Sequence, residues 1–463
     1  MRRLIVNRDT VECGEPDGLV LLDFLRRGLR LTGVKEGCRE GDCGACLVLV
    51  GEPEGAGVRW RAVNSCLFPI GDAAGRHVVT VEGLNRDGLT PVQEAILAEG
   101  ATQCGFCTPG FVVALTAWLL TARAFTAEEA ENAAAGNLCR CTGYLSLRRA
   151  CARLAERFAP LAARPAAERL PALIAAGVVP DYFAGSAERL RALAEPAGPP
   201  PAGAVRIGGG TDLFVQRPEV LETAPLHFLF RDPELRGIRR ENGGWFVGAA
   251  TIVEELAAAD DLAAAIPGWR VAFPLISSLP IRERATIAGN LVNASPIADL
   301  AILLLPLDAQ VEVRGPAGMR LVPLARLYRD YKKLDLAPDE IVRGVRFATP
   351  RPGARFHFEK VSRRVHLDIA SVNSAALFEM EDGRIRRAAV SAGGVAPIPK
   401  RLTAAETALA GRSPDGAALR AAQDAADSDI HPISDVRGSA SYKRMLLRSL
   451  LAAHFAACFE GTP

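Results

Sequence analysis

The sequence predicts a multidomain α+β protein, and three observations support this fold class. The chain has 463 residues, a length typical of about three domains. Strand patterns dominate the first 83 residues, helical patterns follow to about residue 158, and both kinds mix from residue 204 onward. Eight of the 11 cysteines fall into two tight sets, one in the strand-rich part and one in the helical part.

The composition and charge of the chain exclude some classes of partner. Lys and Arg number 55 against 53 Asp and Glu, and the net charge of +2 does not indicate nucleic-acid binding. The longest apolar runs, 111–120 and 297–307, are short for a membrane span, and Asp299 interrupts the second. No apolar signal core develops before the polar residues 7–9, so we expect no secretory signal. We therefore expect a soluble, cytoplasmic protein without a membrane or nucleic-acid partner.

The first predicted domain, residues 1–84, contains the first cysteine set. Three of its thiols lie in one glycine-rich loop and the fourth follows a strand-like segment. The spacing Cys-x4-Cys-x2-Cys with a later cysteine is typical of plant-type [2Fe–2S] sites. A disulfide framework is disfavoured without a secretory signal, and a four-cysteine zinc site more often shows two Cys-x-x-Cys pairs. The predicted iron ligands are Cys38, Cys43, Cys46 and Cys66.

The elements of this domain predict a β-grasp, ferredoxin-like fold. Residues 3–12 have the pattern of a strand, a turn and a second strand, and apolar residues recur at helical spacing over 19–29. Further strands are predicted at 47–50 and 78–81. Together they predict a small mixed sheet that one helix crosses.

The second predicted domain, residues 85–159, is a helical bundle with a second cysteine set. Thr90 and Thr126 each begin a capping box, an apolar helix covers 111–120, and a last amphipathic helix ends near residue 158. A zinc knuckle or a redox disulfide are alternatives here, although Cys-x-Cys is cramped for zinc and a redox pair does not need four thiols. A helix that starts beside the set would stabilise a negative iron–thiolate group. The predicted ligands are Cys104, Cys107, Cys139 and Cys141.

Both cysteine sets and their neighbours resemble the iron–sulfur part of the molybdenum hydroxylases. This family includes xanthine dehydrogenase, aldehyde oxidase and carbon monoxide dehydrogenase, and the resemblance covers about residues 3–158. It implies that each cysteine set holds one [2Fe–2S] cluster. The motifs that carry the resemblance are at 35–38, 42–46, 64–66, 103–110 and 137–144.

A linker rich in Ala and Pro is predicted at 160–180, followed by a third domain at 181–348. In this domain a strand leads into three successive glycines and a threonine, whose amides could face a pyrophosphate closely. The pattern is not Gly-x-Gly-x-x-Gly, so it does not support a Rossmann fold, and a glycine-rich turn alone is usually only a turn. A second glycine loop at 286–290 and the carboxylate of Asp299 add groups suited to phosphate and ribityl contacts. Asp299 is also a candidate N-cap for a helix at 300–305.

The third domain resembles the FAD-binding domain of the same hydroxylases and of the vanillyl-alcohol oxidase group. The resemblance implies that the strand and first glycine loop cradle the pyrophosphate of FAD, and that the second loop and Asp299 also touch the cofactor. It further implies that three positions line the isoalloxazine or the adenine. The implied FAD contacts are Val205, Arg206, Ile207, Gly208, Gly209, Gly210, Thr211, Asp212, Leu213, Ile276, Thr286, Gly289, Asn290, Asp299, Val342 and Lys360.

The last predicted domain, residues 349–463, is α+β and resembles the C-terminal domain of those flavoproteins. Strand patterns at 355–360, 372–379 and 386–393 surround a hairpin turn at residues 382–383, and a helix is predicted at 445–458.

The predicted carriers form an electron relay, because flavin exchanges both single electrons and hydride. No stretch resembles the molybdopterin domains, so the chain looks like the small subunit of bacterial xanthine dehydrogenases. This resemblance implies a larger molybdopterin-binding subunit that hydroxylates hypoxanthine or xanthine. It implies that electrons pass through the helical-domain cluster, the first-domain cluster and FAD to NAD, in a heterotetramer built as a dimer of heterodimers. We predict no catalytic residue for the hydroxylation in this chain.

Two alternatives stay open at this point. The chain could serve another molybdenum hydroxylase, which oxidises an aldehyde, an N-heterocycle or a benzoyl thioester. It could also be a non-enzymatic iron–sulfur redox sensor with a degenerate flavin site. Released flavin together with about four irons per chain would exclude the redox sensor.

Overall fold

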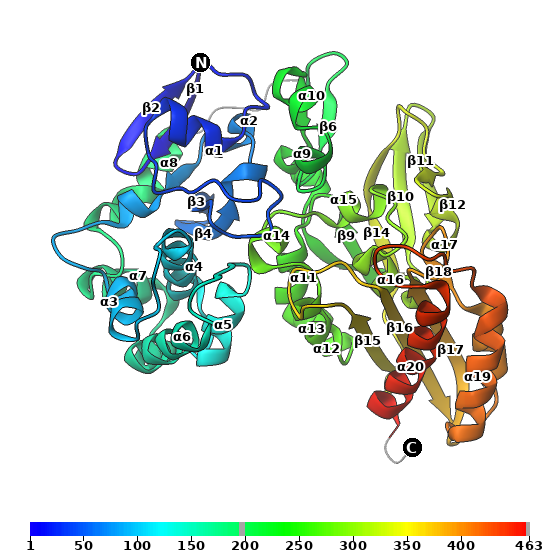
Figure 1. The fold of residues 1–463 in the computed structure, drawn as a ribbon. Coiled ribbons are helices and arrows are strands. Elements are labelled where there is room, and N and C mark those ends of the chain that lie inside the picture. Colours follow the sequence, from blue (N-terminus) through cyan, green and yellow to red (C-terminus); the bar gives the residue numbers. More distant parts are fainter. Residues whose placement is uncertain (194–199, 460–463) are drawn as a thin grey trace. The chain divides into compact units, whose positions relative to one another are not determined.

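The computed structural model describes residues 1–193 and 200–459, and these form two compact units (Figure 1). The first unit contains residues 1–228 and the short segment 278–284, and the second contains the rest. Both units mix helices and strands, which confirms the predicted α+β multidomain class. Within the described residues, every helix is too short or too polar to cross a lipid bilayer. Residues 194–199 and 460–463, parts of the predicted third and fourth domains, lie outside the description.

The first unit begins with the mixed sheet that the sequence predicts. Its strand order is β2-β1-β5-β3-β4, with β1 and β5 parallel and the other neighbours antiparallel. Asn7 makes the first reversal in the left-handed region, at φ 54°. Helix α1 continues into a π-helical turn and crosses the sheet. This arrangement is the expected β-grasp fold. The elements are β1 (Arg2–Val6), β2 (Asp9–Cys13), α1 (Leu21–Asp23) with its π-turn (Phe24–Gly28), β3 (Leu47–Glu54), β4 (Gly57–Asn64), α2 (Ile70–Ala73) and β5 (His77–Val79).

The helical bundle follows, and its caps form largely as the sequence predicts. The Thr90 hydroxyl accepts from the Gln93 amide and the Gln93 side chain accepts from the Thr90 amide, a complete capping box. At the second predicted box, Thr126 accepts from the Glu129 amide, but the Glu129 carboxylate accepts from backbone amides at 123–125 instead. The helices are α3 (Pro91–Ala98), α4 (Thr108–Thr121), α5 (Ala127–Ala134) and α6 (Leu145–Phe158).

The region predicted to be a linker contains helical structure that packs with the cluster domains. Leu173 of α7 is buried in the core of the helical bundle. Leu190 and Leu193 of α8 pack against Ile5 in the β-grasp sheet. The chain up to residue 193 is therefore part of the first unit. Its elements are a 3₁₀ turn (Ala159–Ala163), α7 (Ala166–Ala175), a second 3₁₀ turn (Asp181–Gly185) and α8 (Ser186–Leu193).

His77 lies at the buried centre of the contact between β5 and α8. Its Nε2 is 2.8 Å from the Asn7 carbonyl oxygen, and its Nδ1 is 3.1 Å from Ser186 Oγ. The rings of Trp60 and Tyr182 pack beside it. Burial lowers the pKa of His77 to about 4, so the imidazole is neutral in the folded protein at neutral pH.

Acidification is expected to destabilise the first unit through His77. The unfolded chain binds a proton at this residue below about pH 6.5, whereas the folded chain does so only near pH 4. The contribution to stability is therefore complete above pH 6.5 and is lost as the pH falls towards 4, in total about 3 kcal/mol. In calorimetry between pH 8 and 5, His77→Gln should show a shallower fall in melting temperature than the wild type. The exposed His431→Gln should follow the wild type, and equal slopes for His77→Gln and the wild type would contradict the prediction.

The first unit ends with a parallel strand pair, and it is joined by a short segment from later in the chain. Strands β6 and β7 pair in parallel, and Ile207 and Phe228 at their ends pack into the core of the β-grasp domain. The later segment, residues 278–284, carries one helical turn. The elements are β6 (Val205–Ile207), α9 (Leu213–Gln216), α10 (Pro218–Thr223), β7 (Leu226–Phe228) and α14 (Leu279–Arg282).

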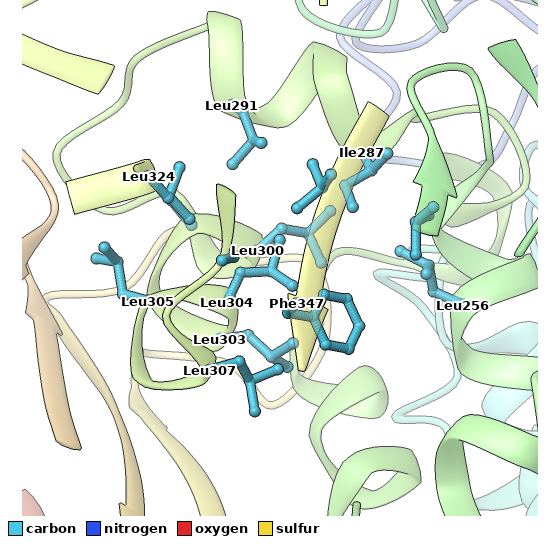
Figure 2. Close-up of a cluster of buried hydrophobic side chains, with 14 of the residues drawn as sticks. Leu256, Ile287, Leu291, Leu300, Leu303, Leu304, Leu305, Leu307, Leu324 and Phe347 are labelled. Atoms are coloured by element: carbon cyan, nitrogen blue, oxygen red, sulfur yellow. The ribbon is translucent and has the colours of Figure 1, made fainter. Parts of the chain in front are cut away.

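The second unit is built on an antiparallel sheet of order β11-β10-β14-β9-β8. Helix α16 is apolar on all sides after its first residue, Asp299, and packs its leucines against Phe347 of β14 in the main core (Figure 2). Leu291 of α15 and Leu324 of α17 close the same core. The strands are β8 (Ile238–Glu241), β9 (Gly244–Gly248), β10 (Gln310–Gly315), β11 (Gly318–Pro323), β12 (Tyr328–Asp330), β13 (Lys333–Leu334) and β14 (Ile341–Ala348). The helices are α11 (Val253–Ala258), α12 (Asp260–Ala265), α13 (Trp269–Ala272), α15 (Ile287–Val292), α16 (Asp299–Leu304) and α17 (Leu324–Leu327), and 3₁₀ turns lie at Leu229–Arg231, Pro233–Leu235, Phe273–Leu275 and Leu305–Leu307.

A second antiparallel sheet, β15-β16-β17-β18, completes this unit, and both its faces are covered. Ala375 and Leu377 of β16 belong to the core with α16, whereas Ala376 and Phe378 face the core with α20, as the two-residue period of a strand requires. The predicted hairpin turn at residues 382–383 joins β16 to β17 with both residues at positive φ. The elements are β15 (Arg355–Val361), β16 (Val372–Glu381), β17 (Arg384–Gly393), β18 (Lys400–Arg401), α18 (Thr403–Leu409), α19 (Gly416–Asp429) and α20 (Ala440–Cys458).

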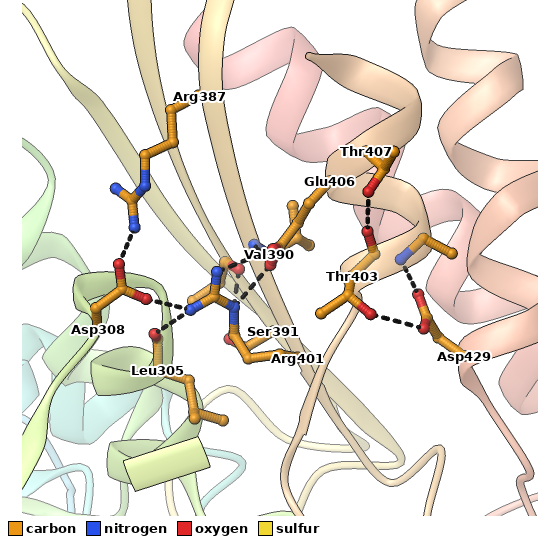
Figure 3. Close-up of polar contacts among 12 residues, drawn as sticks. Leu305, Asp308, Arg387, Val390, Ser391, Arg401, Thr403, Glu406, Thr407 and Asp429 are labelled. Carbon is orange, nitrogen blue, oxygen red and sulfur yellow. Dashed lines mark hydrogen bonds and ion pairs between the residues drawn. The ribbon is translucent and has the colours of Figure 1, made fainter. Parts of the chain in front are cut away.

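A polar contact fastens this second sheet to the end of α16 (Figure 3). Asp308 follows the helix in the left-handed region, and its carboxylate accepts from Arg387 of β17 and, at 2.5 Å, from Arg401 of β18. Arg401 also donates to the Leu305 carbonyl at 3.0 Å and to Glu406 of α18. The contact holds α16, and so Asp299 at its other end, in a fixed position on the sheet.

Candidate cofactor-binding site

The first cysteine set forms two thiol pairs in the β-grasp domain. The Cys38 thiol lies beside that of Cys43, and the Cys46 thiol lies beside that of Cys66. The backbone amides of Glu40 and Asp42 each donate to Cys38 Sγ at 3.3 Å. The contact with Cys43 and these amides lower the pKa of Cys38 to about 5, which favours the thiolate that binds iron.

The pairing of the thiols fits a [2Fe–2S] cluster better than a zinc ion. Each iron of such a cluster takes two cysteines, whereas zinc requires four ligands around one point. A Cβ on Gly37 would lie 2.8 Å from Cys43 Sγ, so this glycine leaves room directly beside a ligand.

The second cysteine set is also paired and lies at the start of a helix. Cys141 Sγ is 3.6 Å from Cys104 Sγ, and the Cys107 thiol lies beside that of Cys139. Burial raises the pKa of the Cys107 thiol to about 12, and the neighbouring Cys139 adds to this rise. Helix α4 begins directly after Cys107, as expected, so its free amides and positive dipole end face the set. Thr142 Oγ1 lies 3.1 Å from Cys139 Sγ.

The loops that carry the two cysteine sets contact each other directly. The Leu138 amide donates to the carbonyl of Cys43 at 3.0 Å, and Leu138 immediately precedes the ligand Cys139. The Asn137 side chain donates to the Gly44 carbonyl at 3.1 Å, across 93 positions of sequence. One hydrogen bond therefore joins the backbone of a first-set ligand to the residue before a second-set ligand. Sequence reasoning missed Asn137 in this role, because no local pattern indicates a partner so distant.

The second cysteine set is partly exposed, and large exposed apolar side chains lie near it in the sequence. Cys104 and Cys141 are exposed. Phe106, between two ligands, is 48% exposed, and Leu145, at the start of α6, is 60% exposed. Exposed large apolar groups next to a ligand loop are typical of a protein–protein contact surface.

The first glycine loop lies in the first unit at the end of β6. Val205, Arg206 and Ile207 form the strand, and Gly208–Asp212 make the turn before Leu213 opens α9. Gly209 and Gly210 are buried, and Gly210 has φ +75°. A Cβ on Gly210 would lie 3.0 Å from the Phe214 ring. The loop is therefore tight and free of side chains at the two positions where a phosphate group could approach the backbone.

The second glycine loop lies in the second unit at the start of α15. Thr286 caps the helix by accepting from the Gly289 amide at 3.1 Å. A Cβ on Gly289 would lie 2.9 Å from the Thr286 hydroxyl. The Oδ1 atom of Asn290 is buried and has no hydrogen-bond partner in the described part of the chain. An unsatisfied amide oxygen and a compact hydroxyl fit a polar ligand at this loop.

Asp299 is the centre of a buried polar group in the second unit. Its Oδ2 accepts from Lys360 Nζ at 2.8 Å, and its Oδ1 accepts from Asn373 Nδ2 at 2.6 Å. Lys360 also donates to the Leu275 carbonyl at 2.9 Å, next to Ile276. The N-cap of α16 is Ala298, so Asp299 does not cap the helix as one interpretation of the sequence suggested.

The structure brings together some of the predicted FAD contacts and also adds a residue. Lys360 and Asp299 pair directly, whereas the side chains of Ile276 and Val342 are buried in the main hydrophobic core. Asn373 was not predicted, and its buried Oδ1 has no partner among the described residues. Val205–Leu213 belong to the first unit, and the other predicted FAD contacts belong to the second.

Comparison with protein-family models divides the chain into four matching regions. Residues 4–70 match a 2Fe-2S iron-sulfur cluster binding domain, and residues 80–152 match a [2Fe-2S] binding domain. Residues 182–350 match the FAD binding domain in molybdopterin dehydrogenase. Residues 356–457 match the CO dehydrogenase flavoprotein C-terminal domain.

Individual relatives agree with these matches. Xanthine dehydrogenase 2 of Arabidopsis thaliana is 28% identical over 499 residues, which cover 90% of this chain and 37% of the relative. Aldehyde oxidase 1 of Rattus norvegicus is 46% identical over 137 residues, which cover 29% of this chain and 10% of the relative. A crystal structure of a Cu,Mo-CO dehydrogenase in its cyanide-inactivated form is 30% identical, with a TM-score of 0.52, and the match covers 55% of this chain and 89% of that one. The chain thus spans little more than a third of the Arabidopsis relative.

Proposed function

Because the chain belongs to the molybdenum hydroxylases, as the part that contains the two [2Fe–2S]-binding domains and the FAD-binding domain, we propose that it is an electron-transfer subunit. In this proposal it carries electrons from a hydroxylating centre on a larger, molybdopterin-binding partner to NAD. The observation that supports it best is the hydrogen bond from the Leu138 amide to the Cys43 carbonyl, which joins the two ligand loops. Such a bond suits two carriers that exchange electrons.

In this proposal the residues of the chain hold and shield the cofactors. When bound, the two [2Fe–2S] clusters supply one-electron chemistry, and FAD supplies both one-electron and hydride chemistry. The eight cysteines of the two sets are the iron ligands. The amides of Glu40 and Asp42 offset the negative charge on Cys38, and Gly37 leaves the space beside Cys43 open.

The same proposal assigns roles to the predicted FAD contacts. Val205–Leu213 would hold the pyrophosphate through backbone amides, and Thr286, Gly289 and Asn290 would contact the cofactor at the second loop. The Asp299–Lys360 pair would lie beside the flavin ring, together with Ile276, and Val342 would contribute to the adenine pocket. The domain boundaries predicted from the sequence, with FAD binding assigned to 181–348, are part of this proposal.

We further propose xanthine or hypoxanthine as the substrate of the partner subunit, in a cytoplasmic heterotetramer. The relative that supports this choice is a xanthine dehydrogenase that aligns over nearly the whole chain. The exposed apolar side chains near Cys104 and Cys141 supply a surface on which a partner could dock.

The test is purification of the tagged chain from its native host under mild conditions. The proposal expects a larger molybdenum-containing chain to copurify, with released flavin and about four irons per copy of this chain. The complex should reduce NAD with xanthine. Turnover only with an aldehyde or carbon monoxide would show that the proposed substrate is wrong and would leave the electron-transfer role unchanged. A chain that contains iron but neither flavin nor a partner would favour a redox sensor.

Gly209→Val is expected to abolish loading of FAD. Gly209 is buried in the first glycine loop, and a branched side chain there would occupy the space of a phosphate group. The flavin released on denaturation should fall close to zero, while the iron content stays unchanged. Gly14→Val is the matched control, since no atom lies within 4 Å of a Cβ at Gly14. A fully flavinated Gly209→Val protein would contradict the assigned role of the loop.

A further inference from the structure

Five charged side chains form a buried group in the first unit. The Asp72 carboxylate accepts a hydrogen bond from Arg284 at 2.8 Å and forms an ion pair with Arg76 at the same distance. Glu52 accepts from Arg76 at 2.6 Å and from Arg61 at 2.5 Å. None of the five residues is more than 9% exposed. Three guanidinium groups against two carboxylates leave one excess positive charge in the group.

The excess positive charge is best assigned to Arg284. Its Nε and Nη2 atoms have no hydrogen-bond partner within the described residues, although the side chain is buried. Burial lowers the pKa of Arg284, which is the direction expected for a cation that its neighbours compensate incompletely. The adjacent Arg59–Glu283 ion pair is neutral and does not change this balance. An uncompensated buried charge is costly unless a further negative group lies nearby.

The segment that carries Arg284 lies against the loop of the first cysteine set. A Cβ on Gly41, which lies between two ligands, would be 2.7 Å from Ile281 of this segment. It would be equally close to Leu67, the residue after the ligand Cys66. Residues 278–284 thus contact the ligand loop itself, and Arg284 is only three residues beyond that contact.

Arg284 also approaches the first cysteine set through an aromatic ring. Its guanidinium carbon lies 4.1 Å from the centre of the Phe68 ring, and that of Arg76 lies 5.4 Å from the same centre. Phe68 is fully buried and follows Cys66 by two residues. A [2Fe–2S] group with four thiolates carries a net negative charge, and one added electron increases it. Arg284, Phe68 and Cys66 are all buried, so solvent screens the positive charge little.

We propose that the buried positive charge of Arg284 raises the reduction potential of the first cluster relative to that of the second. Arg284 acts through its charge and does not bind the cluster. The inference rests on the proposed function, in that Cys38, Cys43, Cys46 and Cys66 must hold a [2Fe–2S] cluster. Reduction adds one electron to the cluster, and the buried guanidinium stabilises the reduced form more than the oxidised form. Electrons that arrive at the second cluster are therefore drawn to the first.

The test is a redox titration of the intact chain with both clusters loaded, followed by electron paramagnetic resonance. Arg284→Met should lower the midpoint potential of the first cluster and leave that of the second unchanged. Loss of one buried unit charge near the first cluster should move the distribution of one electron between the clusters by roughly tenfold towards the second. Arg284→Lys retains the charge and should remain close to the wild type. Asp72→Asn removes a negative charge and should shift the first cluster in the opposite direction.

The second cluster is the internal reference, and Arg153→Met, an exposed arginine on α6, is the matched control. Equal shifts in Arg284→Met and Arg284→Lys would show a structural effect and overturn the inference, as would no shift in either. If Arg284→Met does not fold, the opposite shift in Asp72→Asn decides the question. If the wild type lacks the paramagnetic signals of the first cluster, the ligand assignment is wrong. If the signals are present but the midpoint potential does not shift in the variants, only the inference about Arg284 is wrong.

Discussion

Replacing Cys43 by serine is expected to remove the first cluster and to leave the second intact. Cys43 lies beside Cys38, with which it would hold one iron in the proposed assignment, and a serine hydroxyl is a poor substitute for a soft thiolate. The iron content should fall from about four to about two per chain. The substitution keeps the Cys43 backbone carbonyl that accepts from Leu138, so the second ligand loop retains its support.

Iron analysis and electron paramagnetic resonance of the two clusters measure this effect. Cys458→Ser is the matched control, because Cys458 is a buried thiol of the second unit, outside both sets. It should retain all the iron. If both sets of paramagnetic signals persist in Cys43→Ser, the assignment of this ligand is wrong.

Asp299→Ala is expected to destabilise the second unit by about 3–5 kcal/mol. The Lys360 side chain is 2% exposed, and its ammonium group would lose the carboxylate of Asp299 and retain the Leu275 carbonyl. Asn373 would also lose the acceptor of its 2.6 Å hydrogen bond. A buried charge left without its counter-ion is among the most destabilising single changes.

The free energy of unfolding of the second unit, from denaturant titration of the flavin-free protein, measures this loss. The control is Asp330→Ala, which breaks the pair with Lys333, where both side chains are more than half exposed. Because solvent screens that exposed pair, the change should leave the free energy of unfolding close to that of the wild type. The double variant Asp299→Ala/Lys360→Met should recover much of the loss. Equal costs at Asp299 and Asp330 would show that the buried pair has no special role.

Local chemistry explains which features the sequence predicts well. The cysteine spacings, the Thr90 capping box and the hairpin turn at residues 382–383 each depend on residues a few positions apart, and the structure confirms the cap and the turn. Family matches support both [2Fe–2S]-binding domains and the FAD-binding domain. Short-range patterns of this kind are visible in a single sequence because the turn or helix itself imposes them.

Long-range partners explain what the sequence could not predict. The Arg284–Asp72 pair joins residues 212 positions apart, and Asn373 contacts Asp299 across 74 positions. No periodicity records either contact. Asp299 is an example. As a helix cap it would contribute about 1 kcal/mol to the stability of the fold, whereas the loss of the counter-ion of a buried lysine costs several times more. The ion pair therefore determines where the carboxylate points, and a local rule cannot foresee it.

The seven residues 278–284 have a practical consequence for anyone who wishes to express the iron–sulfur half alone. They come from the region that matches the FAD-binding family, yet they supply Ile281 against Gly41 and Arg284 to Asp72 in the first unit. A fragment truncated after Phe228 would uncover the ligand loop at Gly41 and leave Asp72 without one counter-ion. The first unit is therefore discontinuous in sequence, and a single cut after Phe228 would remove seven of its residues.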